Sequence, residues 1–250
     1  MILPLCKIDL PASAAKFYNT IFQIAAFDVY DLGDIIDSLL DLEETDPLTE
    51  SFEKIGFESR GFLHNMGTMI FFYVLYPFLI LVHKISTKFR NCSRCCRKTQ
   101  SKLRGLLYYN WLIATIFESY AIIALCCLIQ LPVISFETYG LSVQGILTIM
   151  FSLLIMTVPF IMLRHAVRNF HALETDVMKR KYGALYEDLK LAQGKMVFLQ
   201  PGFFLVRRLM LAIAVVVAYD TLIVQIFIIM GQSIIAVIIA NYTRPFKSAR

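Results

Sequence analysis

The sequence KISTKFRNCSRCCRKTQSKLR, residues 84–104, decides how the rest of the chain is interpreted. It contains eight Lys or Arg residues and no Asp or Glu, and a long apolar segment lies on each side of it. Moving this many positive charges across a bilayer is costly, so loops rich in Lys and Arg remain on the cytoplasmic side. The stretch therefore predicts a cytoplasmic loop, and it sets the orientation of the segments on both sides.

The composition is typical of a membrane protein. Hydrophobic residues make up 58% of the 250 residues, and the mean hydropathy is +0.64, whereas soluble domains contain roughly 45–50% apolar residues. The net charge of +5 is unevenly divided, because residues 1–65 hold twelve acids and four bases, and residues 66–250 hold seven acids and twenty bases. The bases lie in loops between apolar segments. Contact with anionic lipid headgroups explains them better than nucleic acid does.

Five apolar segments predict transmembrane helices. They cover residues 66–83, 106–130, 145–163, 203–219 and 222–240. The inner loops are residues 84–105 and 164–202; the second has the pattern of an amphipathic helix on the inner leaflet, ended by Pro201 and Gly202. No Lys or Arg after Arg60 falls in an outer link. The predicted fold is an all-α, polytopic transmembrane bundle of five spans, with residues 1–65 outside and the carboxyl terminus inside.

The outer segment, residues 1–65, is predicted to be acidic and helical. In its second helix, Leu32, Ile35, Ile36 and Leu39 fall on one face, and Asp28, Asp31, Asp34, Asp37 and Asp41 fall on the other. The aspartates lack the alternating spacing of a calcium-binding loop. Charges at helical spacing usually form a solvated face. No metal site is predicted there.

Polar residues inside the predicted spans are the candidates for transport. Glu118 lies about 18 Å from the inner end of the second span at 1.5 Å per residue, and intramembrane acids often mark ion or proton paths. Gln232 and Ser233 lie near the same depth on the fifth span. A structural hydrogen bond between helices is the alternative for Glu118.

The basic residues near the inner membrane edge are predicted to contact lipid headgroups, where long side chains extend toward the interface. These residues are Lys88, Arg90, Arg94, Arg97, Lys98, Arg207 and Arg208. Cys92, Cys95 and Cys96 lie among them, next to the membrane, and are candidates for S-palmitoylation. Free thiols and a zinc site are the alternatives, but zinc needs a fourth ligand that the loop does not provide.

Nothing in the sequence predicts an enzyme. There is no Gly-rich phosphate loop, no nucleophile elbow and no His-Glu metal motif. The four histidines, His64, His83, His165 and His171, lie apart at the edges of spans. We therefore expect no catalytic residue, no cofactor and no metal.

Several short phrases resemble the carboxyl-terminal multispan region of large ciliate surface proteins, which is itself loosely similar to transient-receptor-potential-like (TRP-like) membrane proteins. These phrases are LPASAAKF (10–17), IAAFD (24–28), FEKIGFES (52–59), FLHNMGT (62–68), KYGALYEDLK (181–190), VRRLMLA (206–212) and RPF (244–246). The resemblance implies a long extracellular portion upstream and brings no established activity. A TRP-like channel has a pore loop between its last two spans, whereas here that link is Asp220-Thr221, too short to line a filter.

Two functions follow from these observations. The first is a membrane domain that anchors or organises a larger cell-surface assembly, with TRP-like ancestry. The second is a cation channel or transporter with a path near Glu118 and Gln232. The expected partners are the bilayer, anionic lipids at the cytoplasmic face, and a homo-oligomer or surface-protein assembly, without nucleic acid. The expected location is the plasma membrane in preference to an endomembrane.

The beginning of the chain allows two interpretations. It shows no signal-peptide pattern, and its apolar start resembles the remnant of an earlier span. The chain is then the end of a longer protein. Alternatively, it is a complete product whose first span serves as a reverse anchor.

Overall fold

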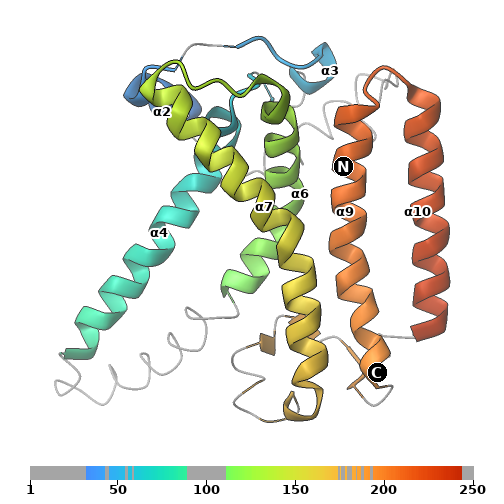
Figure 1. Ribbon diagram of the computed structural model, residues 1–250. Helices are drawn as coiled ribbons and strands as arrows, with labels where there is room; N and C mark the ends of the chain where they lie inside the picture. The colour runs from blue at the N-terminus through green and yellow to red at the C-terminus, as the bar shows by residue number, and fades with distance from the viewer. Residues whose placement is uncertain are drawn as a thin grey trace, which may run out of the picture. The chain divides into compact units, whose positions relative to one another are not determined.

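The computed structural model describes residues 32–42, 45–53, 56–57, 59–88, 111–173, 175, 178, 182–183, 185–186, 189–191 and 194–243. All the elements in this part of the chain are helices (Figure 1). The α-helices are α2 (Leu32–Leu40), α3 (Glu50–Glu53), α4 (Phe62–Lys88), α6 (Trp111–Gln130), α7 (Tyr139–Arg168), α9 (Leu199–Val217) and α10 (Leu222–Thr243). Short 3₁₀ turns are η3 (Leu131–Val133), η4 (Phe170–Ala172) and η6 (Lys195–Phe198).

The chain forms two compact units. Unit 1 contains Met1–Ile70, Ser119–Pro159 and Leu205–Ala236, and unit 2 contains Phe71–Glu118, Phe160–Phe204 and Val237–Arg250. Each of the five long helices contributes one segment to each unit.

Four of the described helices are long and apolar enough to cross a membrane. They are Ile113–Val133, Tyr139–His165, Lys195–Val217 and Leu222–Thr243, and they overlap the predicted second to fifth spans; residues 106–110 of the second span lie outside the described residues. The predicted first span lies inside α4, a helix of 27 residues whose side chains are described only in part. The expectation of an all-helical protein with apolar helices of membrane-spanning length is confirmed. The count of five spans and their orientation remain predictions.

The fourth helix begins earlier than the sequence predicts. We expected Pro201 and Gly202 to end an inner helix before the span, but both residues lie inside the first turn of α9. Proline is tolerated there, because the first amides of a helix have no partner within it. Consequently η6 and α9 form one apolar stretch, Lys195–Val217. The predicted two-residue link to the next helix is a turn of four residues, 218–221.

Side chains on α10 are distributed in the reverse of the pattern in a soluble helix. Its buried residues are Gln225, Gln232 and Thr243, which recur at helical spacing and so form one stripe. Its exposed side chains include Ile223, Val224, Ile226, Phe227, Met230, Ile234, Ile235, Val237 and Ile238. A soluble helix buries its apolar face against a core. An apolar exposed face with a polar buried stripe is the distribution expected of a helix surrounded by lipid.

Helix α7 repeats this distribution. Gln144 and Thr148 are buried, whereas its exposed side chains include Ile146, Ile149, Met150, Leu153, Leu154, Met156, Phe160 and Ile161. In unit 1, the Tyr120 hydroxyl of α6 donates a hydrogen bond of 2.9 Å to the Ile155 carbonyl of α7. Polar contacts thus hold the helices together from inside, and apolar side chains cover the outside.

Unit 2 contains a small apolar cluster in the region where we expected the second inner loop. Its buried members are Leu173, Tyr186, Leu189, Val197 and Phe198. The Tyr186 hydroxyl donates a hydrogen bond of 2.8 Å to the Leu173 carbonyl, and burial raises the pKa of Tyr186. Val167, Phe170 and Leu185 pack against this cluster. Helix α7 continues to Arg168, and a 3₁₀ turn follows it. The inner segment therefore does not begin as a separate helix at residue 164.

Helix α2 packs on the rest of unit 1 through a face that the sequence did not predict. Ile35 and Leu39, the expected apolar face, are 62% and 81% exposed, while Gly33 is buried. A Cβ on Gly33 would lie only 3.0 Å from the His64 carbonyl oxygen. Glycine suits this position because the backbone of α2 comes so close to α4 that a larger residue would have to displace His64 by a few tenths of an ångström.

The end of α2 is held by a C-terminal cap and by α7. Asp41 has a φ of 51°, and the Leu42 amide donates to the Asp37 carbonyl at 3.0 Å, which is the arrangement of a Schellman cap. The Leu40 carbonyl oxygen then lies against Gly140, where an added Cβ would be well under 3.0 Å from it. This contact fixes the end of α2 to the first turn of α7.

Candidate functional site

The best-defined polar site of unit 1 surrounds the side chain of Gln130, the last residue of α6. Its Oε1 accepts hydrogen bonds from the Phe62 backbone amide at 3.2 Å and from the Gln144 Nε2 at 2.9 Å. Both glutamine side chains are buried. Phe62 is the first residue of α4, where backbone amides lack partners within the helix. Gln130 therefore caps α4 and joins the ends of α4, α6 and α7. We call Phe62, Gln130 and Gln144 the glutamine cap.

The segment before α4 is held by hydroxyl and amide groups next to the glutamine cap. The Ser59 Oγ accepts a bond from the Gly61 amide and pairs with the Thr45 Oγ1, both at 2.9 Å. The Asn65 side chain donates to the Ser59 carbonyl at 2.6 Å. Apolar packing adds to these bonds, because the Phe52 and Phe57 rings meet edge to face with centroids 5.9 Å apart. The described part of residues 45–61 is therefore fixed to the helix ends.

Helix α2 is joined to α4 by a short polar contact. The His64 Nδ1 lies 2.7 Å from the Asp37 Oδ2, and both side chains are mostly buried. The contact is an ion pair when the imidazole is protonated. Asp37 thus contacts α4, and Asp41 belongs to the C-terminal cap of α2. Two residues of the predicted acidic face therefore have roles within the fold.

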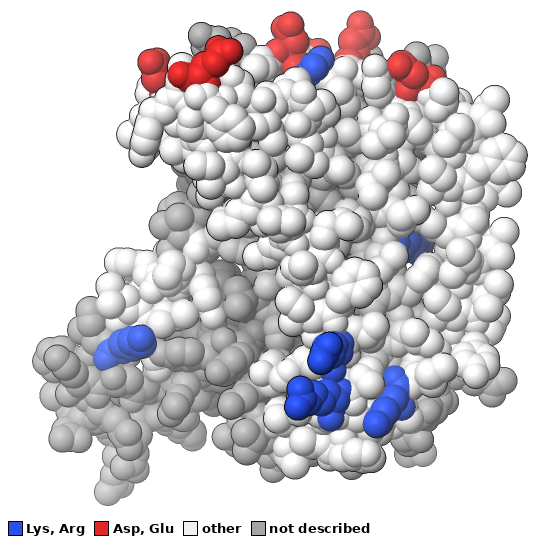
Figure 2. All heavy atoms as spheres, viewed as in Figure 1, with Lys and Arg blue, Asp and Glu red and all other residues white. Residues whose placement is uncertain are grey.

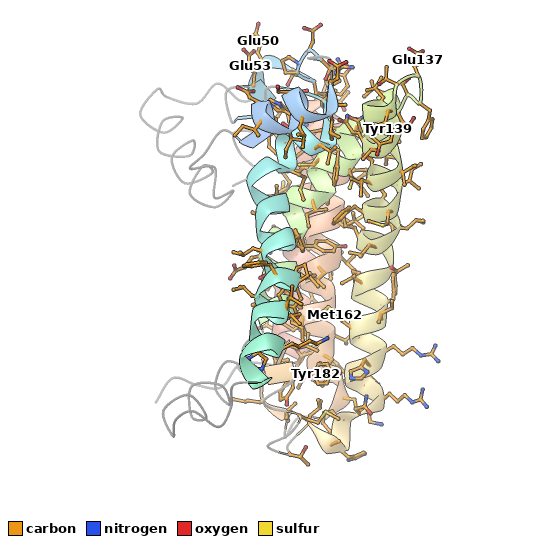
Figure 3. All side chains as sticks on the ribbon, turned by 90° about the vertical axis from the view of Figure 1, so that its left-hand side faces the viewer. Glu50, Glu53, Glu137, Tyr139, Met162 and Tyr182 are labelled. Carbon is orange, nitrogen blue, oxygen red and sulfur yellow. The ribbon has the colours of Figure 1, made fainter. Side chains whose placement is uncertain are left out.

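Asp28 and Asp31 of that face lie outside the described residues. The other described acids of unit 1 lie at its surface. In Figure 2 the Asp and Glu side chains gather along one edge of this unit, and in Figure 3 Glu50, Glu53 and Glu137 point away from the helices at that edge. The described acids of unit 1 are Asp34, Asp37, Asp41, Asp46, Glu50, Glu53, Glu137 and Asp220. No group of three metal-ligating side chains occurs among the described residues.

Two glutamines of α10 form a different polar feature. Gln225 is 0% exposed and Gln232 is 8% exposed, and neither amide has a hydrogen-bond partner for its nitrogen or oxygen among the described residues. They are seven residues apart, so they share one face of the helix about 10 Å apart. A buried amide without a partner costs about 1–3 kcal/mol.

Arg207 lies at the same depth as Gln232. Arg207 lies ten residues before Val217, the end of α9, and Gln232 lies ten residues after Leu222, the start of α10. Each residue is therefore about 15 Å along its helix from the turn that joins the two helices. Arg207 is also twelve residues from Lys195, so it lies near the middle of the apolar stretch. Its Nε is buried without a hydrogen-bond partner in the described part of the chain. The Arg207 side chain is partly exposed, but this nitrogen lies inside unit 1.

The predicted transport residues are only partly brought together. Gln232 and Ser233 are neighbours in unit 1, and the Ser233 hydroxyl donates to the Ile229 carbonyl of its own helix at 2.8 Å. Glu118 is an exposed residue at the edge of unit 2. Glu118 belongs to unit 2 and Gln232 to unit 1, so a shared path through both stays a prediction.

The predicted headgroup and palmitoylation residues are described less fully. Lys88 is the last residue of α4, and Arg208 is partly buried on α9. The other members lie outside the described residues: Arg90, Arg94, Arg97, Lys98, Cys92, Cys95 and Cys96. Contact of these residues with lipid and modification of the cysteines remain predictions.

The glutamine cap and the burial of Gln225 were not predicted from the sequence. Gln130 and Gln144 stand at the ends of predicted spans, where a polar residue is ordinary. Gln225 had one usable signal, since it precedes Gln232 by seven residues in an otherwise apolar helix. Such spacing places both amides on one face.

Comparisons with protein-family profiles, with curated proteins and with solved structures found no match. The function therefore has to be argued from the geometry of this chain.

Proposed function

We propose that this chain is a multi-pass membrane domain that anchors or organises a larger cell-surface assembly. The glutamine cap is the observation that carries the proposal. It joins the start of α4 to the last residue of α6 and to the second turn of α7 through buried hydrogen bonds. It lies immediately beside the segment that leads into the membrane helices. A load applied to residues before α4 would be shared among three helices.

The reversed distribution of side chains supports the membrane part of this proposal. Buried amides and hydroxyls with an apolar exterior are stable in hydrocarbon, where each backbone and polar group must be satisfied internally. In water, the exposed apolar faces of α7 and α10 would form large patches that soluble monomers avoid.

The proposed topology has five spans, with residues 1–65 outside and the carboxyl terminus inside. Eight of the nine described acids belong to unit 1, the exception being Glu118. Unit 2 contains the described bases Lys84, Lys88, Arg164, Arg168, Lys190 and Lys195. Tags inserted after Glu137 and after Lys190 should react from opposite sides of the membrane. Reaction of both from the same side would overturn the topology.

The anchoring role can be tested by pulling on the chain in a bilayer. The full chain is held through a handle at its amino terminus, and the force at which residues 32–61 detach is measured. Gln130→Leu leaves the Phe62 amide without its acceptor, so this force should fall. Thr157→Val is the control, because the Thr157 hydroxyl bonds only within its own helix. An unchanged detachment force in Gln130→Leu would contradict the proposal.

A cation channel or transporter is the second candidate. The observation in its favour is Gln232, a buried amide without a partner among the described residues. Arg207 at the same depth counts against it, since a fixed positive charge repels cations. Potassium flux into liposomes that is abolished by Glu118→Gln, with unchanged protein content, would favour this function over anchoring alone.

A further inference from the structure

The guanidinium of Arg207 has a buried nitrogen without a partner at the middle of an apolar helix. Arginine keeps its charge in proteins because its pKa lies above about 12. An ion in a medium of low dielectric costs several kcal/mol unless an opposite charge accompanies it. No Asp or Glu lies on α9 or α10, and no described residue accepts a bond from the Arg207 Nε. The charge therefore needs a counter-charge that is not part of these helices.

The two glutamines of α10 provide the other groups that an ion would need. Gln232 is at the depth of Arg207, and Gln225 lies about two turns further toward the connecting turn. Each amide has two N–H donors, and neither is used by a described residue. The buried stripe of α10 contains these amides and no charged side chain.

On α9 a small side chain lies at the depth of Gln225. Arg207 shares a helical stripe with Leu211 and Ala214, which are buried. Ala214 lies eleven residues before Gln225 and close to the turn, so the antiparallel hairpin places this small side chain near the depth of Gln225. A polar interior of one positive charge and several N–H donors is complementary to an anion.

We propose that the interior of unit 1 along α9 and α10 binds a small inorganic anion, such as chloride, with Arg207 as the counter-charge and the amides of Gln232 and Gln225 as donors. The inference rests on the proposed embedding in a membrane and is independent of the anchoring role. A lipid phosphate has the same chemistry, but the headgroups lie about 15 Å from the centre of the bilayer. The depth of Arg207 therefore favours a free anion.

Thermal unfolding of the full chain in a neutral detergent tests the proposal. Chloride is titrated against gluconate at constant ionic strength, and an anion bound only by the folded state raises the Tm as its concentration rises. The Tm of the unmodified chain should rise with chloride. Arg207→Gln should lower the apparent affinity by roughly tenfold or more, the factor that 1.4 kcal/mol represents. Arg164→Gln, an exposed arginine in the last turns of α7, makes the same change of charge and should respond as the unmodified chain does.

Gln232→Leu keeps the test decisive if Arg207→Gln does not fold. Removing a buried, unpaired amide should raise the Tm without chloride, and the response to chloride should weaken. A Tm that ignores chloride, or that responds equally in Gln232→Leu and the unmodified chain, would overturn the site.

Two further measurements identify the source of the counter-charge. In vesicles of phosphatidylcholine, the chloride response should persist without anionic lipid. A change in Tm that appears only when phosphatidylserine is added would overturn the proposal. So would a change in Tm that follows the potassium concentration when potassium is exchanged for N-methylglucamine. None of these outcomes alters the detachment force of the anchoring test, so the two proposals can fail separately.

Discussion

Replacing Gly140 by alanine should loosen the attachment of α2 to unit 1. The added Cβ would lie well under 3.0 Å from the backbone oxygen of Leu40 and 3.0 Å from a methyl of Leu42. A backbone oxygen cannot move as a flexible side chain can, so α2 and the first turn of α7 must separate by about 1 Å to restore ordinary contact. The substitution thus acts at one defined contact.

The size of the effect follows from two opposing terms. Overpacking costs about 1–3 kcal/mol, and the higher helix propensity of alanine offsets up to about 1 kcal/mol. The net loss of about 1–2 kcal/mol corresponds to roughly a 5- to 30-fold decrease in hydrogen-exchange protection. The decrease should be confined to the amides of α2, and mass spectrometry of exchanged peptides measures it.

Gly231→Ala is the matched control within the same unit. A Cβ at Gly231 meets no atom within 4 Å, so this change should leave the protection of α2 unaltered while stabilising α10 slightly. Unchanged or higher protection of α2 in Gly140→Ala would refute the close approach of Leu40 to α7.

Three further substitutions test other contacts. Gln130→Leu should destabilise unit 1 by about 1–3 kcal/mol because buried donors lose their acceptor, seen as a lower Tm in detergent. Asp41→Gly should stabilise the cap of α2 by about 1 kcal/mol, since glycine accepts a positive φ without strain; lower exchange protection of α2 would count against this. Burial raises the pKa of Tyr186, so the stability of its cluster should be constant below about pH 10 and fall as the pH rises through the raised pKa. Tyr186→Phe should be less stable near neutral pH by about 1 kcal/mol and should lose this alkaline dependence, which unfolding followed by tyrosine fluorescence would show.

The helices could be predicted from local sequence because length and hydropathy are local properties. Helix α6 ends at Gln130 as expected, and the turn after α9 lies where the short link was predicted. The predicted start of α9 is wrong because Pro201 does not break this helix. The residue stands in the first turn, where it breaks no hydrogen bond.

Contacts between distant segments could not be predicted in this way. The face of α2 was assigned from periodicity, but its packing is decided by Gly33 and Asp37, which meet His64 of α4. The glutamine cap likewise depends on residues far apart in sequence. Periodicity shows which residues share a face, but not which neighbour that face contacts.

The capping of α4 also fixes an order of events during synthesis. The acceptor for the Phe62 amide is 68 residues further along the chain, which the ribosome makes about 3–14 s later at 5–20 residues per second. Helix α4 is therefore synthesised before the side chain that caps its first turn. The contact that caps α4 can form only after α6 has been made to its last residue.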